Sequence, residues 1–228
     1  DHNDNSMSFT TNTNERLRID SSGNLLIGTT TEGTGSGDNL TVAASGNMGL
    51  TLRSTSSNYC NIYFSDATSG TAEYEGYMSY NHATDSLEFA TGHTERLRIN
   101  SSGQLLLGTT TPGAAQVDTF TLETSGHTGM TLFSGTSSRG TIAFGDGRSG
   151  NAQYRGVILY EHSNDSMRFA TADTTQMNIS SNGHITKTNQ PSFAAYRNVS
   201  DYVVNAGAKF EFNTTRHNIG NHYSTSNH

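Results

Sequence analysis

The chain repeats its own sequence at a fixed interval, so that a residue and its counterpart in the next copy differ in number by 80. Residues 15–23 (ERLRIDSSG) return as residues 95–103 (ERLRINSSG), and a weaker third copy at residues 177–183 falls on the same repeat step. The copies stay aligned without insertion or deletion. Repetition of this kind is typical of arrays whose product is length or surface, and it is rare in a catalytic domain. Architecture is therefore the first property that the sequence predicts.

Apolar side chains are few for a chain of 228 residues, since 32% of the residues are hydrophobic, 14% are charged and none is Trp. Ordering one residue costs roughly 1–2 kcal/mol, whereas apolar burial returns about 25 cal/mol per Å². A unit this poor in apolar side chains needs a disulfide, a metal or association to remain folded. Cys60 is the single cysteine and its counterpart is Gly140, which excludes an intrachain disulfide. We therefore expect association with identical chains.

The formal net charge is −7, and the Lys and Arg residues are scattered. Phosphate binding needs a concentrated basic patch, so this charge pattern argues against nucleic acid as a partner. No stretch reaches the roughly 20 apolar residues that span a bilayer. We expect no nucleic acid, no membrane insertion and no cofactor. The chain starts partway into a repeat, so we expect it to be a segment of a longer protein.

Polar and apolar side chains alternate, as they do in strands with two different faces. Within residues 95–99, Leu97 and Ile99 occupy one face, and Arg96 and Arg98 occupy the other. An Asn-Ser-Ser-Gly sequence and a second apolar run follow, which predicts a hairpin whose Gly supplies the positive φ of a tight turn. We expect roughly six to eight short strands in each unit.

Comparison of the copies predicts which face of a strand is buried. Residues 74–80 and 154–160 keep Tyr, Gly, Met or Ile, and Tyr at one parity, while the other parity varies. The constant parity should point inward. The same two-residue spacing recurs in Leu50 and Leu52, Ile62 and Phe64, and Leu87 and Phe89.

These features predict an all-β fold of tandem 80-residue β-repeats that form an intertwined homotrimeric fibre shaft. Three chains around one axis would share a core and cover the sheet edges. The expected shared core is Leu17, Ile19, Ile62, Phe64, Tyr74, Met78, Tyr80, Phe89, Leu97, Ile99, Ile142, Phe144, Tyr154, Ile158, Tyr160 and Phe169. With an arbitrary starting point, the expected parts are repeats at 1–80 and 81–160, a partial repeat at 161–186, a linker at 187–191 and a different module at 192–228.

The repeat also carries recognisable sequence stretches at residues 85–91 (DSLEFAT), 95–103, 107–112, 144–156 and 165–171 (DSMRFAT). Together they resemble the shaft repeats of bacteriophage tail-fibre and appendage proteins and of related bacterial surface proteins, over about residues 1–185. The resemblance implies a trimeric β-rich shaft, often placed before a receptor-binding head.

The last part of the chain carries a different pattern, at residues 190–197 (QPSFAAYR), 212–213 and 218–223 (NIGNHY). It looks like the opening strands of the trimeric jelly-roll head shared by complement and tumour-necrosis-factor-like proteins. The resemblance implies that residues 192–228 begin such a head and that most of its binding surface lies beyond His228.

Two histidines hold the same position in successive copies. His82 and His162 continue the parity of the preceding Tyr, and His2 fits the same step. On a threefold axis three such imidazoles could converge on a metal. The alternative is a partly buried histidine that hydrogen-bonds to the turn at Asp85 or Asp165. We expect this structural role and no metal, because no second ligand follows at a fixed short spacing.

Further polar residues recur with the repeat. Asp66 and Asp146 could suggest a calcium loop, but the alternating carboxylates of such a loop are missing, so we expect them to accept hydrogen bonds within their own turns. Four arginines lie on the outer strand face: Arg16, Arg18, Arg96 and Arg98. They could contact acidic glycans, but we expect them to pair with Glu and Asp.

Paired carboxylates could cleave glycans, and the candidates are Glu15, Glu95, Asp85 and Asp165. A catalytic pair would have to be reproduced in every copy, and no Trp is present to stack on a sugar. No Ser-His-Asp motif, phosphate loop or zinc spacing is found in the sequence. We expect no enzymatic activity.

The sequence therefore predicts a structural component of an extracellular trimeric fibre. The expected example is a phage tail fibre, on the virion tail or appendage, with a receptor-binding head for host attachment. Its partners would be two identical chains and a cell-surface glycan or protein receptor bound by the head. The alternatives are a bacterial surface adhesin or secreted filament subunit, and a glycan-depolymerising tailspike.

Overall fold

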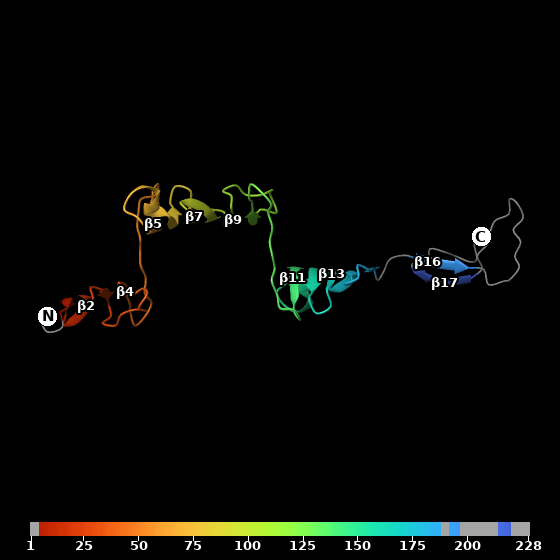
Figure 1. Ribbon diagram of the computed structural model, residues 1–228, viewed down its shortest axis with the longest axis horizontal. Coiled ribbons are helices and arrows are strands. Elements are labelled where there is room, and N and C mark those ends of the chain that lie inside the picture. The colour runs from red at the N-terminus through yellow and green to blue at the C-terminus, as the bar shows by residue number, and fades with distance from the viewer. Residues whose placement is uncertain (1–4, 188–191, 197–213, 220–228) are drawn as a thin grey trace, which may run out of the picture. The chain divides into compact units, whose positions relative to one another are not determined.

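The computed structural model describes residues 5–187, 192–196 and 214–219 (Figure 1). These residues form an all-β protein with two short 3-10 helices, η1 (Gly70–Tyr74) and η2 (Gly150–Tyr154). By internal contacts the chain divides into two compact units, Asp1–Thr128 and Gly129–His228. The expectation of an all-β fold is confirmed.

The strands follow one another within each sheet in chain order (Figure 1). The first sheet contains β1 (Met7–Thr11), β2 (Asn14–Ile19), β3 (Leu25–Ile27) and β4 (Leu40–Val42). The second contains β5 (Tyr59–Phe64), β6 (Gly76–Asn81), β7 (Ser86–Thr91), β8 (Thr94–Ile99), β9 (Leu105–Leu107) and β10 (Phe120–Leu122). The third contains β11 (Arg139–Phe144), β12 (Gly156–Glu161), β13 (Ser166–Thr171), β14 (Thr174–Ile179) and β15 (Ile185–Lys187).

The secondary structure recurs at the spacing of the sequence. β5, η1, β6, β7, β8 and β9 begin and end one repeat step before β11, η2, β12, β13, β14 and β15. β2, β3 and β4 precede β8, β9 and β10 by the same step. Tyr80 and Tyr160, where the sequence analysis ended its repeats, lie inside β6 and β12, so the first strand of a sheet is a better starting point for the unit.

The predicted hairpin on Ser-Ser-Gly is confirmed, and a hairpin also forms in the third copy, where the turn reads Ser-Asn-Gly. β8 pairs antiparallel with β9, as β2 does with β3 and β14 with β15. Gly103 has a φ of +76°, which Gly adopts without steric cost. The Asn100 side-chain oxygen accepts hydrogen bonds from the backbone N–H groups of Ser102 at 3.1 Å and Gln104 at 3.0 Å. This Asx-type turn closes the hairpin.

After each of the first two hairpins, a longer connection leads to a further strand that pairs parallel with the last strand of the hairpin. β10 pairs parallel with β9, and β4 with β3. Gly108 begins the return at a φ of +77°, and its N–H donates to Arg96 O at 2.9 Å. A Cβ at Gly108 would collide with the carbonyl oxygen of Glu123. The chain therefore needs Gly here both for its dihedral angle and for the close backbone approach.

A β-bulge interrupts the pairing of β7 with β8. Phe89 pairs with Leu97 and Ala90 pairs with Glu95, so Arg96 is the extra residue. In an unbulged strand, residues three apart point to opposite faces. The extra residue brings Glu95 and Arg98 to the same face, where their side chains meet. The same register shift occurs between β1 and β2 and between β13 and β14.

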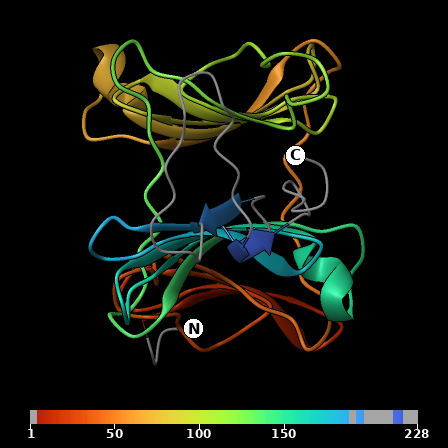
Figure 2. The same ribbon diagram turned by 90° about the vertical axis from the view of Figure 1, so that its right-hand side faces the viewer.

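The described core is very small. Leu26, Ala90 and Leu106 are the only hydrophobic residues that are buried among the described residues. The strands of the β5–β10 sheet, coloured yellow to green, form a single layer (Figure 2). A single sheet in one chain leaves one of its faces without a covering layer.

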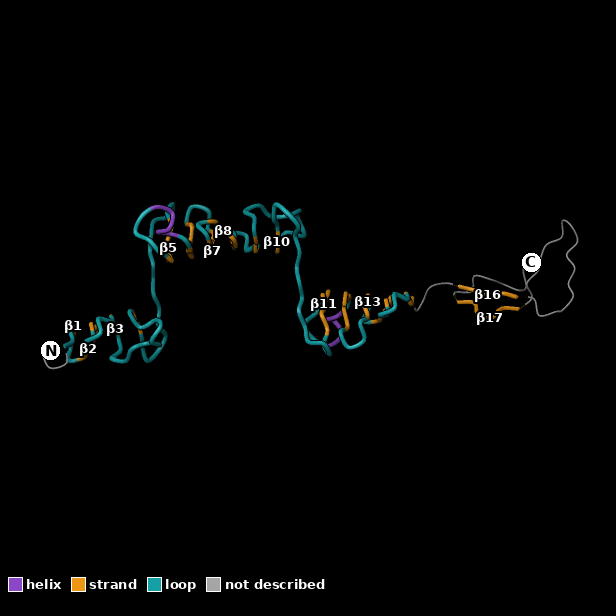
Figure 3. The backbone as a smooth tube through the Cα atoms, viewed as in Figure 1, coloured by secondary structure: helices purple, strands orange, loops and turns teal. Residues whose placement is uncertain are grey.

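Two expectations about strands are wrong. Leu50 and Leu52 belong to no strand, because residues 44–54 have no partner strand within the described part of the chain (Figure 3). Tyr74 and Tyr154 do not continue the strands of Met78 and Ile158. Each ends a 3-10 turn instead, and this turn breaks the strict alternation that the prediction assumed.

The C-terminal part contains a two-stranded antiparallel ribbon of β16 (Ser192–Tyr196) and β17 (Thr214–Ile219). Its register shifts between Ala194 and Ala195. The structure describes no further strand of residues 192–228, so the expected jelly-roll head lies mainly outside the described residues. Of the expected linker at 187–191, only Lys187 is described, and it ends β15 instead of starting a linker.

Candidate functional site

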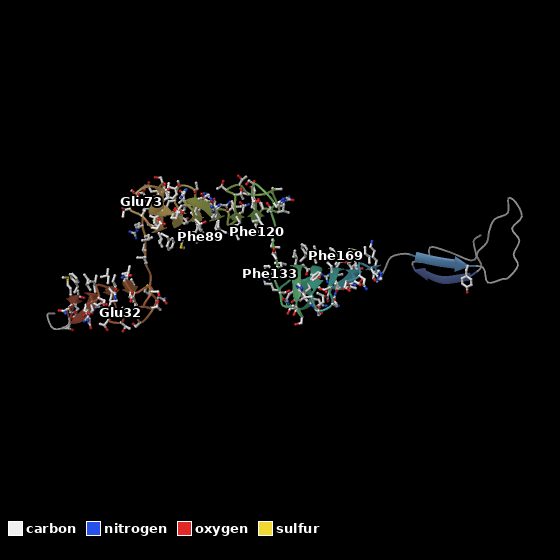
Figure 4. The ribbon with its side chains drawn as sticks, in the orientation of Figure 1. Glu32, Glu73, Phe89, Phe120, Phe133 and Phe169 are labelled. Atoms are coloured by element: carbon white, nitrogen blue, oxygen red, sulfur yellow. The ribbon has the colours of Figure 1, made fainter. Side chains whose placement is uncertain are left out.

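The most distinctive surface is the face of the β5–β10 sheet that carries two rows of apolar side chains across neighbouring strands. The register gives the first row as Cys60, Tyr80, Leu87, Ile99, Leu105 and Phe120. The second row is Ile62, Met78, Phe89, Leu97, Leu107 and Leu122. We call these rows the apolar ladders. Phe89 and Phe120 project from the same side of the sheet (Figure 4).

The ladders recur in the other sheets. In the first sheet the register aligns Met7, Ile19, Leu25 and Leu40, and Phe9, Leu17, Ile27 and Val42. In the third sheet it aligns Tyr160, Met167, Ile179 and Ile185, and Ile142, Ile158, Phe169, Met177 and Lys187. Apart from Lys187 at the end of one row, each sheet therefore presents one apolar face, as the constant parity of the sequence predicts.

This apolar face is open to solvent in the single chain. Phe64 is 59% exposed, Phe120 50% and Ile62 43%. None of the residues expected to form the shared core is buried. Those that are half-buried are Leu17, Phe89, Leu97, Ile158 and Phe169, and those that are exposed are Ile19, Ile62, Phe64, Tyr74, Met78, Tyr80, Ile99, Ile142, Phe144, Tyr154 and Tyr160. Contiguous apolar surface of this kind marks an interaction site.

The opposite face of the β5–β10 sheet is polar and carries buried charge. Arg98 Nη2 lies 3.0 Å from Glu88 Oε1 and 2.6 Å from Glu95 Oε2. Ser86 Oγ donates to the same Glu88 Oε1 at 2.7 Å. Glu88 is only 5% exposed, so its charge needs the guanidinium beside it. The hydrogen bonds that Arg98 donates to Glu95 outweigh the cost of burial and raise the pKa of Arg98 above its ordinary value.

In the third sheet the corresponding charges join three neighbouring strands. Arg139 Nε on β11 lies 2.7 Å, and Arg168 Nη2 on β13 lies 3.2 Å, from Glu161 Oε2 on β12. Burial opposes ionisation of Glu161. The hydrogen bonds from Arg139 and Ser163 and the two positive charges outweigh it, so the pKa of Glu161 lies below its ordinary value of 4.5.

Of the four predicted arginines, Arg18 and Arg98 pair with Glu, as expected, whereas Arg16 and Arg96 contact threonines. Arg18 lies 2.9 Å from Glu15, which reproduces the Arg98–Glu95 pair. Arg16 and Arg96 are the bulge residues, and their Nε groups donate to Thr11 and Thr91. The sequence alone did not predict that Arg98 is largely covered, because the bulge that brings Glu95 beside it is visible only in the register of the partner strand.

The structure places the predicted histidines beside tyrosines. The rings of His82 and Tyr80 have centroids 4.9 Å apart, as do those of His162 and Tyr160. His82 Nε2 also lies 3.6 Å from Cys60 Sγ. No group of three or more metal-ligating side chains occurs within the described part of the chain. His2 lies outside the described residues.

The carboxylates at the Asp85 and Asp165 turns accept hydrogen bonds from tyrosines and not from the predicted histidines. Tyr80 OH donates to Asp85 at 3.4 Å, and Tyr160 OH donates to Asp165 at 3.1 Å. These contacts, together with burial, raise the pKa of both phenols. A histidine in the expected role would have to reach a carboxylate that already has a donor.

The two loops at Asp66 and Asp146 are closed by backbone hydrogen bonds. The Asp66 and Asp146 N–H groups donate to Ala72 O at 3.3 Å and Ala152 O at 2.9 Å. The Asp146 carboxylate lies 3.4 Å from Arg155 Nε. We predicted that these carboxylates accept hydrogen bonds within their own turns. The structure shows instead that main-chain hydrogen bonds close the two loops.

No pair of the predicted carboxylates is brought together, because Glu15, Glu95, Asp85 and Asp165 each have a separate partner. A carboxyl pair that the sequence analysis missed is Asp20 with Glu32. The nearby Asp20 carboxyl group, with its negative charge, raises the pKa of Glu32. The next copy has Asn100 and Pro112 at these positions, so this pair is not a repeated device.

Two segments lack main-chain pairing. Residues 44–54 and 124–134 form no strand and no backbone–backbone hydrogen bond among the described residues (Figure 3). Several of their apolar side chains are exposed, with Leu50 at 72% and Phe133 at 95%. Ser134 Oγ is buried without a hydrogen-bond partner. A chain whose donors and acceptors lack main-chain partners can pair with another chain.

The described residues thus define an all-β protein whose sheets each have one open apolar face. No protein-family model and no curated protein matches the chain. No helix of the described residues is long and apolar enough to cross a membrane.

Proposed function

We propose that the chain is a segment of an extracellular homotrimeric fibre, a phage tail-fibre shaft that leads to a receptor-binding head. The observation that carries the proposal is the open apolar face of each sheet. Burial returns about 25 cal/mol per Å² of apolar surface, so the ladders are a large source of stability that a single chain leaves unused. Identical chains can supply the missing cover.

Three copies suit this geometry. Each sheet is one layer with one apolar face, so three sheets that face a common axis enclose a core to which every copy contributes equally. The resemblance of the repeats to trimeric shafts favours three copies over two. Sharing one core would also cover or pair the exposed edges of the sheets.

The segments without main-chain pairing support exchange between chains. Residues 44–54 and 124–134 connect one sheet to the next and have backbone groups without main-chain partners within the described chain. If each segment pairs with a neighbouring copy, its exposed apolar side chains enter the same shared core. The chains would then be intertwined and not merely adjacent.

The proposed role is mechanical. A stiff shaft holds the head away from the particle and transmits attachment to the host cell. Three heads on one axis gain affinity for a repeated glycan or protein receptor through avidity. The proposal assigns no catalytic step, metal or cofactor to this segment.

The test is the native mass in solution, measured by light scattering. Three chains of 24.5 kDa give a particle of about 73.5 kDa. The double variant Phe64→Asp with Phe144→Asp places a carboxylate on the apolar face of two sheets, where the desolvation penalty should abolish assembly. A folded wild-type monomer of 24.5 kDa would end the proposal.

The matched control is Tyr63→Asp. Tyr63 adjoins Phe64 in β5 and is similarly exposed, at 55% against 59%, but it points to the opposite face. The control should keep the mass of the wild type. Equal loss of assembly in both variants would show that the charge disrupts β5 itself and not the apolar face.

A further inference from the structure

The face opposite the apolar ladders contains a tyrosine hollow, which is not needed for a shared core. The hollow has a volume of about 290 Å³, and its walls are Tyr59, Tyr63, Tyr74 and Tyr77. Ser79 and Glu88, both buried, also line it. Tyr59, Tyr63 and Tyr74 are exposed. An exposed cluster of aromatic rings on an otherwise polar face indicates an interaction site.

The rings meet at angles instead of stacking flat. The centroid of Tyr63 lies 6.4 Å from that of Tyr74, with 57° between the planes. It lies at the same distance, 6.4 Å, from Tyr77, with 79° between the planes. Rings inclined in this way wall a corner in which one small group can approach more than one ring. A cation is attracted to ring faces within about 6 Å of their centroids.

The charges next to the rings are negative in sum. Glu88 and Glu95 share the single guanidinium of Arg98, which leaves one net negative charge. The contacts of Glu88 with Ser86 and Arg98 are both made to Oε1, and the described residues provide no partner for Oε2. Burial and the charges of Glu88 and Glu95 raise the pKa of Tyr77, as a negative local potential should.

The third sheet has its own cations at the same place. Arg139 and Arg168 stand at the positions equivalent to Tyr59 and Glu88, and they line a hollow of about 390 Å³ with Tyr154. Both arginines bind Glu161. In the third sheet, guanidinium groups of the chain itself therefore fill this site. In the β5–β10 sheet, the site offers tyrosine rings and a carboxylate, and Arg98 is the one cation beside it among the described residues.

We propose that the tyrosine hollow binds an organic cation of the methylated or quaternary ammonium type, with the faces of the tyrosine rings around the cation and Glu88 as its counter-charge. This site lies within one chain and on the face away from the ladders. It is therefore independent of the proposed trimer and stays accessible if the ladders are covered.

The test is isothermal titration calorimetry of the full chain with choline chloride and with tetramethylammonium chloride, at constant ionic strength. We expect saturable binding with a Kd of about 1–10 mM. The neutral isostere of choline, in which carbon replaces the ammonium nitrogen, should bind about tenfold more weakly or not at all. No saturable binding of either cation, or equal binding of the isostere, overturns the proposal.

The third sheet supplies residues for two substitutions. Tyr63→Ala and Tyr77→Val introduce the residues found at the equivalent positions, Ala143 and Val157. Each should weaken choline binding about fivefold or more, with circular dichroism and native mass unchanged. Unchanged affinity in both variants would overturn the proposal.

The Tyr63→Phe variant distinguishes the contribution of the tyrosine ring to binding from that of its hydroxyl. It keeps the ring face and should bind choline about as well as the wild type, because the attraction comes from the ring. A loss as large as that of Tyr63→Ala would mean that the hydroxyl carries the contact, and saturable binding of glucose without binding of choline would point to a sugar. Either result overturns the assignment of a cation.

Discussion

At the scale of single residues, two glycines show how the same dihedral angle can serve different needs. Gly103 and Gly108 have φ values of +76° and +77°. A Cβ at Gly103 would meet no atom within 4 Å, whereas a Cβ at Gly108 would collide with the carbonyl oxygen of Glu123. The first Gly serves a turn, and the second also allows β10 to pair with β9.

We predict that Gly108→Ala is much more destabilising than Gly103→Ala. Positive φ costs a residue with a Cβ roughly 1–2 kcal/mol, which is the whole expected effect at Gly103. At Gly108 the collision adds to it, for a total of about 3 kcal/mol or more. Denaturant unfolding of the two variants measures the difference. Equal losses would show that Glu123 moves aside without cost.

Only part of this residue-level picture could be predicted from the sequence. The Ser-Ser-Gly turn was predictable because Gly follows a run of turn-forming residues. The close approach at Gly108 was not, since it depends on β10, which begins only at Phe120 after a long connection. The tyrosine partners of Asp85 and Asp165 were also missed, because the turn brings residues five apart together.

At the scale of strands, the β-bulge is the main feature that alternation does not predict. Strict alternation places Glu95 and Arg98 on opposite faces, yet they form an ion pair at 2.6 Å. The hairpins and the parity of the ladders were predictable, because each depends on residues next to one another in sequence. Leu50 and Leu52 have the spacing of a strand but no partner strand among the described residues. A pattern indicates which side chains point together, and it does not show what the backbone pairs with.

A pH prediction belongs to this scale, because Glu161 joins β12 to the arginines of β11 and β13. Its pKa is lowered in the folded chain, so its stabilising contribution is present above the ordinary value of 4.5 and is lost as the pH falls through the lowered value. We predict that Glu161→Gln lowers the thermal midpoint at pH 7. The difference from the wild type should shrink below about pH 4.

Asp146→Asn is the control for this prediction. Asp146 also pairs with an arginine, Arg155, but the two side chains are 67% and 50% exposed, so water screens the pair. Its thermal midpoint should change little at either pH. A Glu161→Gln variant with the same midpoint as the wild type at pH 7 would contradict the stabilising role of the cluster.

At the scale of the whole molecule, the apolar ladders and the unpaired main chain occur in separate parts of the chain. The ladders lie on the sheets, whereas residues 44–54 and 124–134 connect the sheets. Self-association addresses both at once if the connecting segments pair with other copies. The sequence predicted the need for association from its composition, but residues far from the ladders were not expected to take part through their backbone.

We predict that amide hydrogens of residues 44–54 and 124–134 exchange slowly in the assembled wild-type protein, because hydrogen bonding to neighbouring chains protects them. In the Phe64→Asp and Phe144→Asp double variant the same amides should exchange rapidly. Hydrogen exchange read by mass spectrometry measures both, with β7 as an internal control that stays protected in each sample. Rapid exchange of both segments in a particle of three chains would contradict intertwining.

The matching bounds of the strands have a consequence for how such a chain can change in evolution. β5 to β9 and β11 to β15 start and stop at equivalent positions of successive copies. Recombination between the corresponding stretches of the gene would delete or duplicate one unit, and the main chain on either side would rejoin in the same register. The chain can therefore gain or lose whole modules without redesign of any contact within a sheet.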